Sequence, residues 1–164
     1  MADQTVATSS LRRQGGALPN QAAARTGFTH KFEIDFSDIN DPTFTTDGDT
    51  VTVTLGNTPE RFAVLAAVGQ IVTAFATDGT LTVMAGIDGD PDAFITAKDA
   101  KTDAVHLQAV GGVIATATGT SGIASDVLVA RFTTQGATGA PADITAGRYE
   151  LYLKLLDLAE LNEG

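Results

Sequence analysis

The chain has 164 residues, 43% of them hydrophobic and 18% charged, which predicts one domain with a buried core. The absence of cysteine excludes disulfides, thiolate metal ligands and a cysteine nucleophile. Residues 1–16 lack the apolar core of a secretory signal, and the apolar run 62–76 is too short to cross a bilayer. We therefore expect a soluble protein.

Charge is distributed unevenly along the chain. The total is −10, but Arg12, Arg13, Arg25 and Lys31 outweigh Asp3 in residues 1–31 and give +3 there, so the rest carries −13. A strongly acidic body repels nucleic acid and anionic membranes, and we expect neither as a partner. The basic segment either anchors on an acidic partner surface through charge-assisted hydrogen bonds or is a solvated tail.

The first part of the chain divides into an arm and two strands. Residues 1–27 show neither strand nor helix periodicity and predict an extended arm, so the domain is expected over 28–164. Residues 28–36 alternate apolar and charged side chains, as a half-buried strand does, and His30 on the apolar parity is more typical of packing than of a ligand. Residues 49–55 alternate valine or leucine with threonine, which predicts a strand with one wet face.

The apolar stretch 58–87 is the expected centre of the core, and its first third is ambiguous. Thr58, Pro59 and Glu60 are typical of a helix start, whereas the following residues fit a strand with a bulge at Gly69. Local evidence leaves both open. The Asp-Gly pair at 78–79 predicts a hairpin between strands at 70–76 and 80–87.

The second half reads as further strands separated by turns. Residues 88–103 predict a connection with one helical turn near 93–98, residues 111–119 and 125–136 predict strands, and 137–147 a loop. The run 148–158 places Tyr149, Leu151, Leu153 and Leu155 on one parity of a closing strand. About eight closely spaced strands predict an all-β fold, an antiparallel β-sandwich or jelly-roll-like domain with an extended N-terminal arm.

Motifs for catalysis are missing, so we expect no enzyme and no cofactor. Neither histidine belongs to a recognisable triad pattern, and no nucleophile elbow or phosphate loop occurs. Four carboxylates have the first, third, fifth and twelfth places of a calcium loop: Asp88, Asp90, Asp92 and Asp99. Ala93 stands where such a loop needs glycine, which favours a turn in which the carboxylates cap backbone amides.

The order of several short motifs resembles the small β-sandwich capsid decoration (cement) proteins of tailed bacteriophages. The resemblance covers about residues 50–158 and rests on four matching pieces: Val72-Thr73-Ala74-Phe75, Thr80-Leu81-Thr82-Val83, Gly89-Asp90-Pro91-Asp92-Ala93-Phe94 and Thr145-Ala146-Gly147-Arg148. It favours the strand over the helix at 58–69. The long basic arm and the alanine-rich 58–69 depart from the family pattern.

The resemblance implies a structural role on the outer surface of a virion. It implies a jelly-roll-like module, often trimeric, bound to the major capsid protein. The charge of the arm, and not the resemblance, makes Arg12, Arg13 and Arg25 candidate capsid or subunit contacts. Two alternatives stay open: a phage tail or head-fibre subunit, and a calcium- or carbohydrate-binding surface module. The absence of tryptophan and the 6% aromatic content count against a sugar platform.

Overall fold

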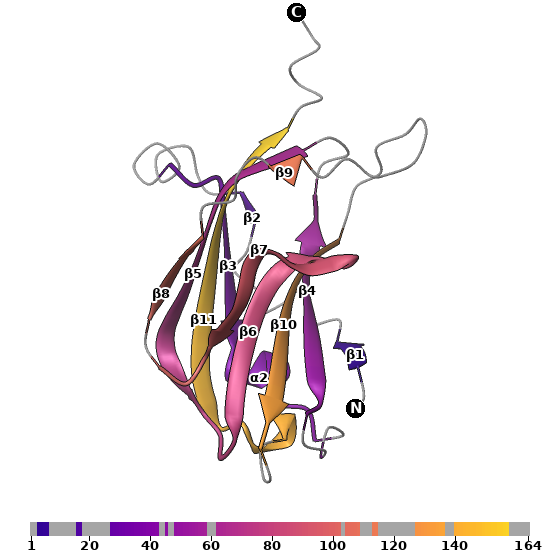
Figure 1. The fold of residues 1–164 in the computed structure, drawn as a ribbon, viewed down its shortest axis with the longest axis vertical. Helices are drawn as coiled ribbons and strands as arrows, with labels where there is room; N and C mark the ends of the chain where they lie inside the picture. Colours follow the sequence, from indigo (N-terminus) through magenta and orange to yellow (C-terminus); the bar gives the residue numbers. More distant parts are fainter. Residues whose placement is uncertain are drawn as a thin grey trace, which may run out of the picture.

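The computed structural model shows two β-sheets packed face to face (Figure 1). It describes residues 3–6, 16–17, 27–42, 45, 48–58, 62–102, 104–108, 113–114, 127–136 and 140–157. In this part of the chain no helix is long and apolar enough to cross a membrane. The two packed sheets confirm the all-β sandwich expected from the sequence.

Each sheet combines strands from distant parts of the chain. Sheet A runs β1 (Asp3–Val6), β4 (Thr50–Asn57), β10 (Val127–Gln135), β6 (Thr80–Ile87) and β7 (Asp90–Asp99). Sheet B runs β2 (Gly16–Ala17), β3 (His30–Asp35), β11 (Ala146–Asp157), β5 (Phe62–Ala76) and β8 (Val105–Gln108), and β9 (Val113–Ile114) also pairs with β5. The short helix α2 (Phe36–Ile39) and the 3₁₀ turn η1 (Pro141–Asp143) complete the described elements.

The connectivity is that of a jelly roll. If β1, β2 and β9 are set aside, eight strands remain. When these eight are numbered from 1 to 8 in chain order, starting with β3, their order across sheet B is 1-8-3-6 and their order across sheet A is 2-7-4-5. Among the described pairings only β1 with β4 is parallel. β1 and β2, which both come from the arm, extend the two sheets at β4 and β3, on the same side of the sandwich.

The strands β3 and β11 confirm the alternation seen in the sequence. Phe32 and Ile34 of β3 are buried, and the alternate residues of β11 from Tyr149 to Leu155 are buried with them. The two strands pair in antiparallel register, with Leu151 opposite Phe32. One face of this pair therefore contributes to the core between the sheets, and the other faces away from it.

The ambiguous segment is a strand from Phe62 onward, as the resemblance favoured, but its bulges are not at Gly69. The ladder between β5 and β11 slips at Leu65 and again around Val72, where β5 has extra residues. Each bulge shifts the inward parity, so Phe62 and Val64 point inward first and Ala67 and Ile71 later. This shift is why the segment lacks a clean period of two.

Two aromatic residues pack over two glycines where β5 and β11 pair. A Cβ atom at Gly69 of β5 would collide with the ring and hydroxyl of Tyr149 from β11. Conversely, a Cβ atom at Gly147 of β11 would collide with the ring of Phe75 from β5. Both rings also contact Phe132 of sheet A, at centroid distances of 5.5 Å from Phe75 and 6.1 Å from Tyr149. The glycines thus let the rings reach the centre of the sandwich.

The expected hairpin at Asp78-Gly79 is wrong. β5 belongs to sheet B and β6 to sheet A, so this turn carries the chain from one sheet to the other. The tight hairpin occurs at the next Asp-Gly pair, residues 88–89, where Ile87 pairs with Asp90. Turn residues fix a change of direction but do not fix which strands pair, and this explains the error.

Residues 88–103 also differ from the expectation of a helical connection. Asp90–Asp99 of this segment form the edge strand β7, whose ladder with β6 slips twice and whose exposure does not alternate. The strand β8 gave no signal in the sequence because it has only four residues. Of the predicted strand at 111–119 only Val113–Ile114 lie within the described residues.

The predicted wet face of β4 is wrong as well. Thr50 and Thr52 are 8% and 1% exposed. The Thr50 hydroxyl lies 3.0 Å from that of Thr133, and Arg131 Nε donates to Thr52 Oγ1 at 3.2 Å. Neighbouring side chains of β10 therefore satisfy hydroxyls that the sequence alone would place in water.

We predict that Gly147→Ala lowers the free energy of unfolding by about 1–3 kcal/mol, because the new methyl group overpacks the core against Phe75. The positive φ of Gly147, +140°, adds backbone strain. Urea unfolding measures the change. Gly89→Ala is the matched control, since a Cβ there meets nothing within 4 Å. Equal stability of the two variants would contradict the packing described for Phe75.

Candidate functional site

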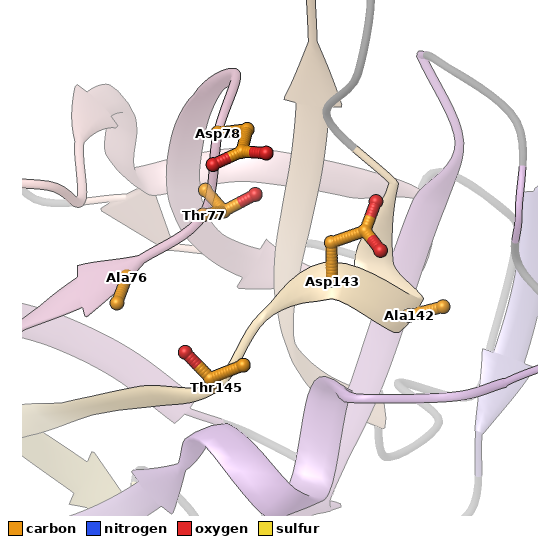
Figure 2. A pocket seen from close by; sticks show the side chains of 6 residues that line it. All are labelled: Ala76, Thr77, Asp78, Ala142, Asp143 and Thr145. Atoms are coloured by element: carbon orange, nitrogen blue, oxygen red, sulfur yellow. The ribbon is translucent and has the colours of Figure 1, made fainter.

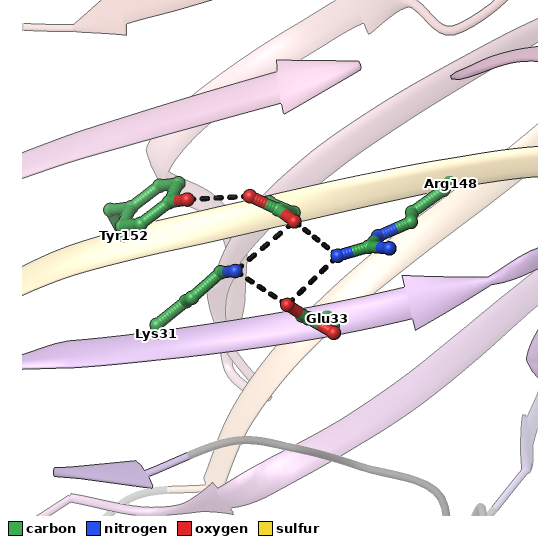
Figure 3. Close-up of polar contacts among 5 residues, drawn as sticks. Lys31, Glu33, Arg148 and Tyr152 are labelled. Atoms are coloured by element: carbon green, nitrogen blue, oxygen red, sulfur yellow. Dashed lines mark hydrogen bonds and ion pairs between the residues drawn. The ribbon is translucent and has the colours of Figure 1, made fainter. Parts of the chain in front are cut away.

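The face of sheet B that points away from the core carries a closed network of four charged side chains (Figure 3). Arg148 Nη2 donates to Glu33 Oε1 at 2.9 Å and to Glu150 Oε1 at 2.6 Å. Lys31 Nζ lies 2.5 Å from the same Glu33 oxygen and 3.1 Å from the same Glu150 oxygen. Each carboxylate therefore contacts both cations.

The network is needed because two like charges face each other. Glu33 and Glu150 are directly opposite in the β3–β11 register, an arrangement that is unfavourable by itself. Lys31 and Arg148 lie two residues away along their own strands, on the same face and on opposite sides of the pair, and they neutralise it. The Tyr152 hydroxyl donates to Glu150 Oε2 at 2.5 Å, and the ring of Phe28 packs 5.8 Å from that of Tyr152. The network thus binds β3 to β11 on the outer face.

Glu150 is the most buried member, at 6% exposure. Burial raises the pKa of its carboxyl, but hydrogen bonds from Tyr152, Lys31 and Arg148 outweigh burial and hold the pKa below its ordinary value. For Lys31, burial lowers the pKa of the ammonium group, and the hydrogen bonds to Glu33 and Glu150 raise it above its ordinary value. Both shifts favour the charged forms near neutral pH.

This outer face is electrically neutral on an acidic protein. Its described charged side chains on β3 and β11 are three cations and three anions: Lys31, Arg148 and Lys154, and Glu33, Asp35 and Glu150. The chain as a whole carries −10. Two copies can therefore approach through this face with less electrostatic repulsion than through the average surface.

The part of the same face formed by β5 and β8 has no described charged side chain and carries several exposed apolar ones. The three exposed large hydrophobic side chains of the described residues are Leu65, Val72 and Val105, at 44%, 39% and 55% exposure. Leu65 and Val72 stand at two of the three places where the β5–β11 register shifts, and Val105 of β8 faces Gln70 of β5. We call Leu65, Val72 and Val105, together with half-buried Val68 between them, the apolar row.

The predicted capsid or subunit contacts Arg12, Arg13 and Arg25 lie outside the described residues. They remain candidates on the grounds of charge alone. The described parts of the same segment, β1 and β2, add to edge strands of both sheets. Strand addition of this kind uses backbone hydrogen bonds and explains why the segment needs no strand periodicity of its own.

The four carboxylates of the candidate calcium loop do not converge. Asp88 lies in the hairpin turn, Asp90 and Asp92 begin β7, and Asp99 ends it. Asp90 and Asp99 are the two ends of this ten-residue strand and lie about 30 Å apart at the usual rise per residue. Asp99 instead accepts hydrogen bonds from the Lys101 amide at 2.9 Å and the Thr102 hydroxyl at 3.0 Å. The loop spacing was misleading because the segment is a strand.

The remaining pair, Asp90 and Asp92, share a hydrogen bond. That bond, followed by burial and by the charge of Asp92, raises the pKa of the Asp90 carboxyl. Within the described residues no three histidine or acidic side chains gather in a way that could hold a metal ion.

An open pocket of about 530 Å³ lies where the β5–β6 turn meets the start of β11 (Figure 2). Its lining consists of small and acidic residues: Ala76, Thr77, Asp78, Ala142, Asp143 and Thr145. Lys101 Nζ donates to the carbonyl oxygens of Thr77 and Gly79 at 2.6 Å, so the ammonium group already binds two backbone carbonyls of this turn. Since no aromatic ring is among the described residues of the lining, these residues offer no stacking platform for a sugar.

The two histidines have different environments. His30 Nδ1 lies 2.9 Å from the Thr29 hydroxyl, and the His30 ring stacks on Phe32 at 6.3 Å, which agrees with a packing role. His106 of β8 is half-buried, and its Nδ1 has no hydrogen-bond partner among the described residues. Burial lowers the pKa of both imidazoles, and the charge of Lys98 lowers that of His106 further.

Sequence reasoning missed the outer face of sheet B. Glu33 and Arg148 are 115 positions apart, and only the β3–β11 register brings them together. The sequence did contain one signal for this face: in both predicted strands the charged residues alternate with the apolar ones, so they fall on the side expected to face water. The apolar row gave no signal, because bulges had displaced its members from any regular pattern.

We predict that Glu150→Gln lowers the free energy of unfolding at pH 7 by about 1–3 kcal/mol, because two cations and a hydroxyl lose a charged acceptor. Because folding lowers the pKa of Glu150, its carboxylate stabilises the fold fully above the ordinary pKa of 4.5, and this stabilisation is lost as the pH falls through the lowered value. Urea unfolding between pH 7 and pH 3 should show the deficit shrinking. Lys154→Gln, exposed on the same face, is the control; a deficit independent of pH would contradict the network's role.

Comparison with known proteins gives no relative of this chain. No protein-family model matches it, and no curated protein or solved structure matches it significantly.

Proposed function

We propose that the chain is a structural, non-enzymatic virion protein that decorates and stabilises the outside of a tailed-phage head. The observation that carries the proposal is the outer face of sheet B, a neutral surface with an apolar row on an otherwise acidic jelly-roll sandwich. Such a face suits repeated contact with copies of the same chain. The motif order that resembles decoration proteins supports the same role.

Two of the resembling motifs have a shared physical purpose in this fold. Phe75 of the first motif packs its ring where a Cβ of Gly147, in the last motif, would lie. Both positions therefore serve the same β5–β11 contact, and their order along the chain follows from the jelly-roll connectivity. This supports the fold that the resemblance implies; the virion role is inferred from the resemblance and the outer face together.

In the proposed assembly the protein forms a homotrimer through the outer face of sheet B. The acidic remainder faces solvent, and Arg12, Arg13 and Arg25 contact the major capsid protein. Each contact is weak alone, and attachment gains its strength from the number of copies and of contacts per copy. No catalysis, cofactor, membrane or nucleic acid takes part.

We predict that the purified protein has about three times the 16.8 kDa mass of the chain in light scattering after size exclusion. Val105→Glu should shift it to the monomer, because burying an unpaired carboxylate in an apolar interface is costly. The exposure of Val105, 55%, makes the variant compatible with folding. Gln135→Glu, exposed on sheet A, is the control and should keep the assembly. A wild-type protein that stays monomeric at all concentrations would contradict self-association.

We further predict that the protein binds phage heads that lack it and raises the temperature at which they disrupt. Replacing Arg12, Arg13 and Arg25 together by glutamate should abolish binding while leaving the far-ultraviolet circular dichroism unchanged. Replacing the same three arginines by lysine keeps the charge of the segment and is the control, which should retain binding. Wild-type protein that leaves head stability unchanged would overturn the proposed function, and electron microscopy showing it on the tail would favour the tail or fibre alternative.

A further inference from the structure

Four buried polar side-chain atoms have no hydrogen-bond partner in the described part of the protein, and two of them lie on the inner face of sheet B. These two are the hydroxyl oxygen of Tyr149 and Nδ1 of His106. Tyr149 is fully buried, with an exposure of 0%. Buried polar side-chain atoms in folded proteins nearly always have a partner, either in the protein or in an ordered water molecule. These two atoms therefore require an explanation.

Both atoms belong to residues that flank the same glycine. The Tyr149 hydroxyl fills the space that a Cβ of Gly69 would occupy. His106 is the register partner of Gly69 in the β5–β8 ladder. Directly opposed residues project to the same face, with Cβ atoms about 5 Å apart. The Tyr149 hydroxyl consequently lies within about 7 Å of the His106 Cβ, on the inner face of sheet B.

The chemistry of the two groups is complementary to one small molecule. Burial raises the pKa of the Tyr149 phenol, which stays protonated and can donate. Burial, and then the charge of Lys98, lower the pKa of His106, so its imidazole is neutral near pH 7, although Asp99 opposes this. An unprotonated Nδ1 accepts a hydrogen bond. The pair offers one donor and one acceptor but makes no direct hydrogen bond.

We propose that a single internal water molecule bridges the Tyr149 hydroxyl and His106 Nδ1. It accepts from the phenol O–H and donates to Nδ1, so the neutral imidazole carries its proton on Nε2. The bridge links the edge strand β8, held to β5 by four register pairs, to the central strand β11 through the interior. Gly69 is required because a methyl group at that position would take the space of the hydroxyl.

A crystal structure of the full chain at high resolution tests the bridge directly. We expect an ordered water within hydrogen-bonding distance of both atoms, and we expect it to be absent in Tyr149→Phe. A dry site, or a direct bond from the Tyr149 hydroxyl to His106 Nδ1, would overturn the proposal.

Thermal unfolding gives an independent test, because the expected change in melting temperature differs in sign with and without the bridging water. With a bridging water, Tyr149→Phe loses two hydrogen bonds and lowers the melting temperature. Without it, the same change removes an unpaired buried hydroxyl and leaves the melting temperature unchanged or raises it, which would overturn the proposal. His106→Asn retains an acceptor near the Nδ1 position and should lower the melting temperature less than His106→Leu; equal losses would count against the bridge.

Nitrogen-15 NMR of the imidazoles reports the tautomer. At neutral pH the His106 Nδ1 signal should be that of an unprotonated, hydrogen-bonded nitrogen, and Tyr149→Phe should shift it. His30, whose Nδ1 already pairs with Thr29, is the internal reference and should not shift. A His106 signal that does not change in the variant would overturn the proposal.

Discussion

The pairing of β5 with β11 is the contact on which the rest of the structure depends. Each strand supplies a glycine under an aromatic ring of the other, Gly69 under Tyr149 and Gly147 under Phe75. Both rings reach across to Phe132 in sheet A, so one strand pair both forms the middle of sheet B and joins the two sheets. Because this arrangement needs two glycines at fixed places, it constrains the sequence more tightly than general hydrophobicity does.

Strand β11 contributes to both faces of sheet B, the inner face that fills the core and the outer face that carries the charged network. Its inward side chains fill the core, while Arg148 and Glu150 on its outer side form the network with β3 that leaves the outer face neutral. Like copies of an acidic protein repel one another, and a neutral face with an apolar row is where that repulsion is weakest. The proposed assembly role follows from this placement of charge rather than from any reactive group.

The sequence predicted what depends on local alternation and missed what depends on register. The strands around Phe32 and Leu151 were found because every second residue is buried. The turn at Asp78-Gly79 was recognised, but its role as a link between sheets depends on β5 choosing β11 and β8 as partners. The strand β7 was missed because its bulges break the alternation, and the Glu33–Arg148 contact because it joins residues 115 positions apart. No local pattern encodes such long-range pairings.

Native-state hydrogen exchange followed residue by residue tests the central place of the β5–β11 pairing most directly. If this pairing is the last to open, the slowest amides should lie in the middle of β5 and β11, around Ile71 and Leu151, and should exchange only by global unfolding. Amides of β7 and β8 at the far edge should exchange through smaller openings. Slowest exchange in sheet A, with β5 and β11 opening earlier, would contradict the account.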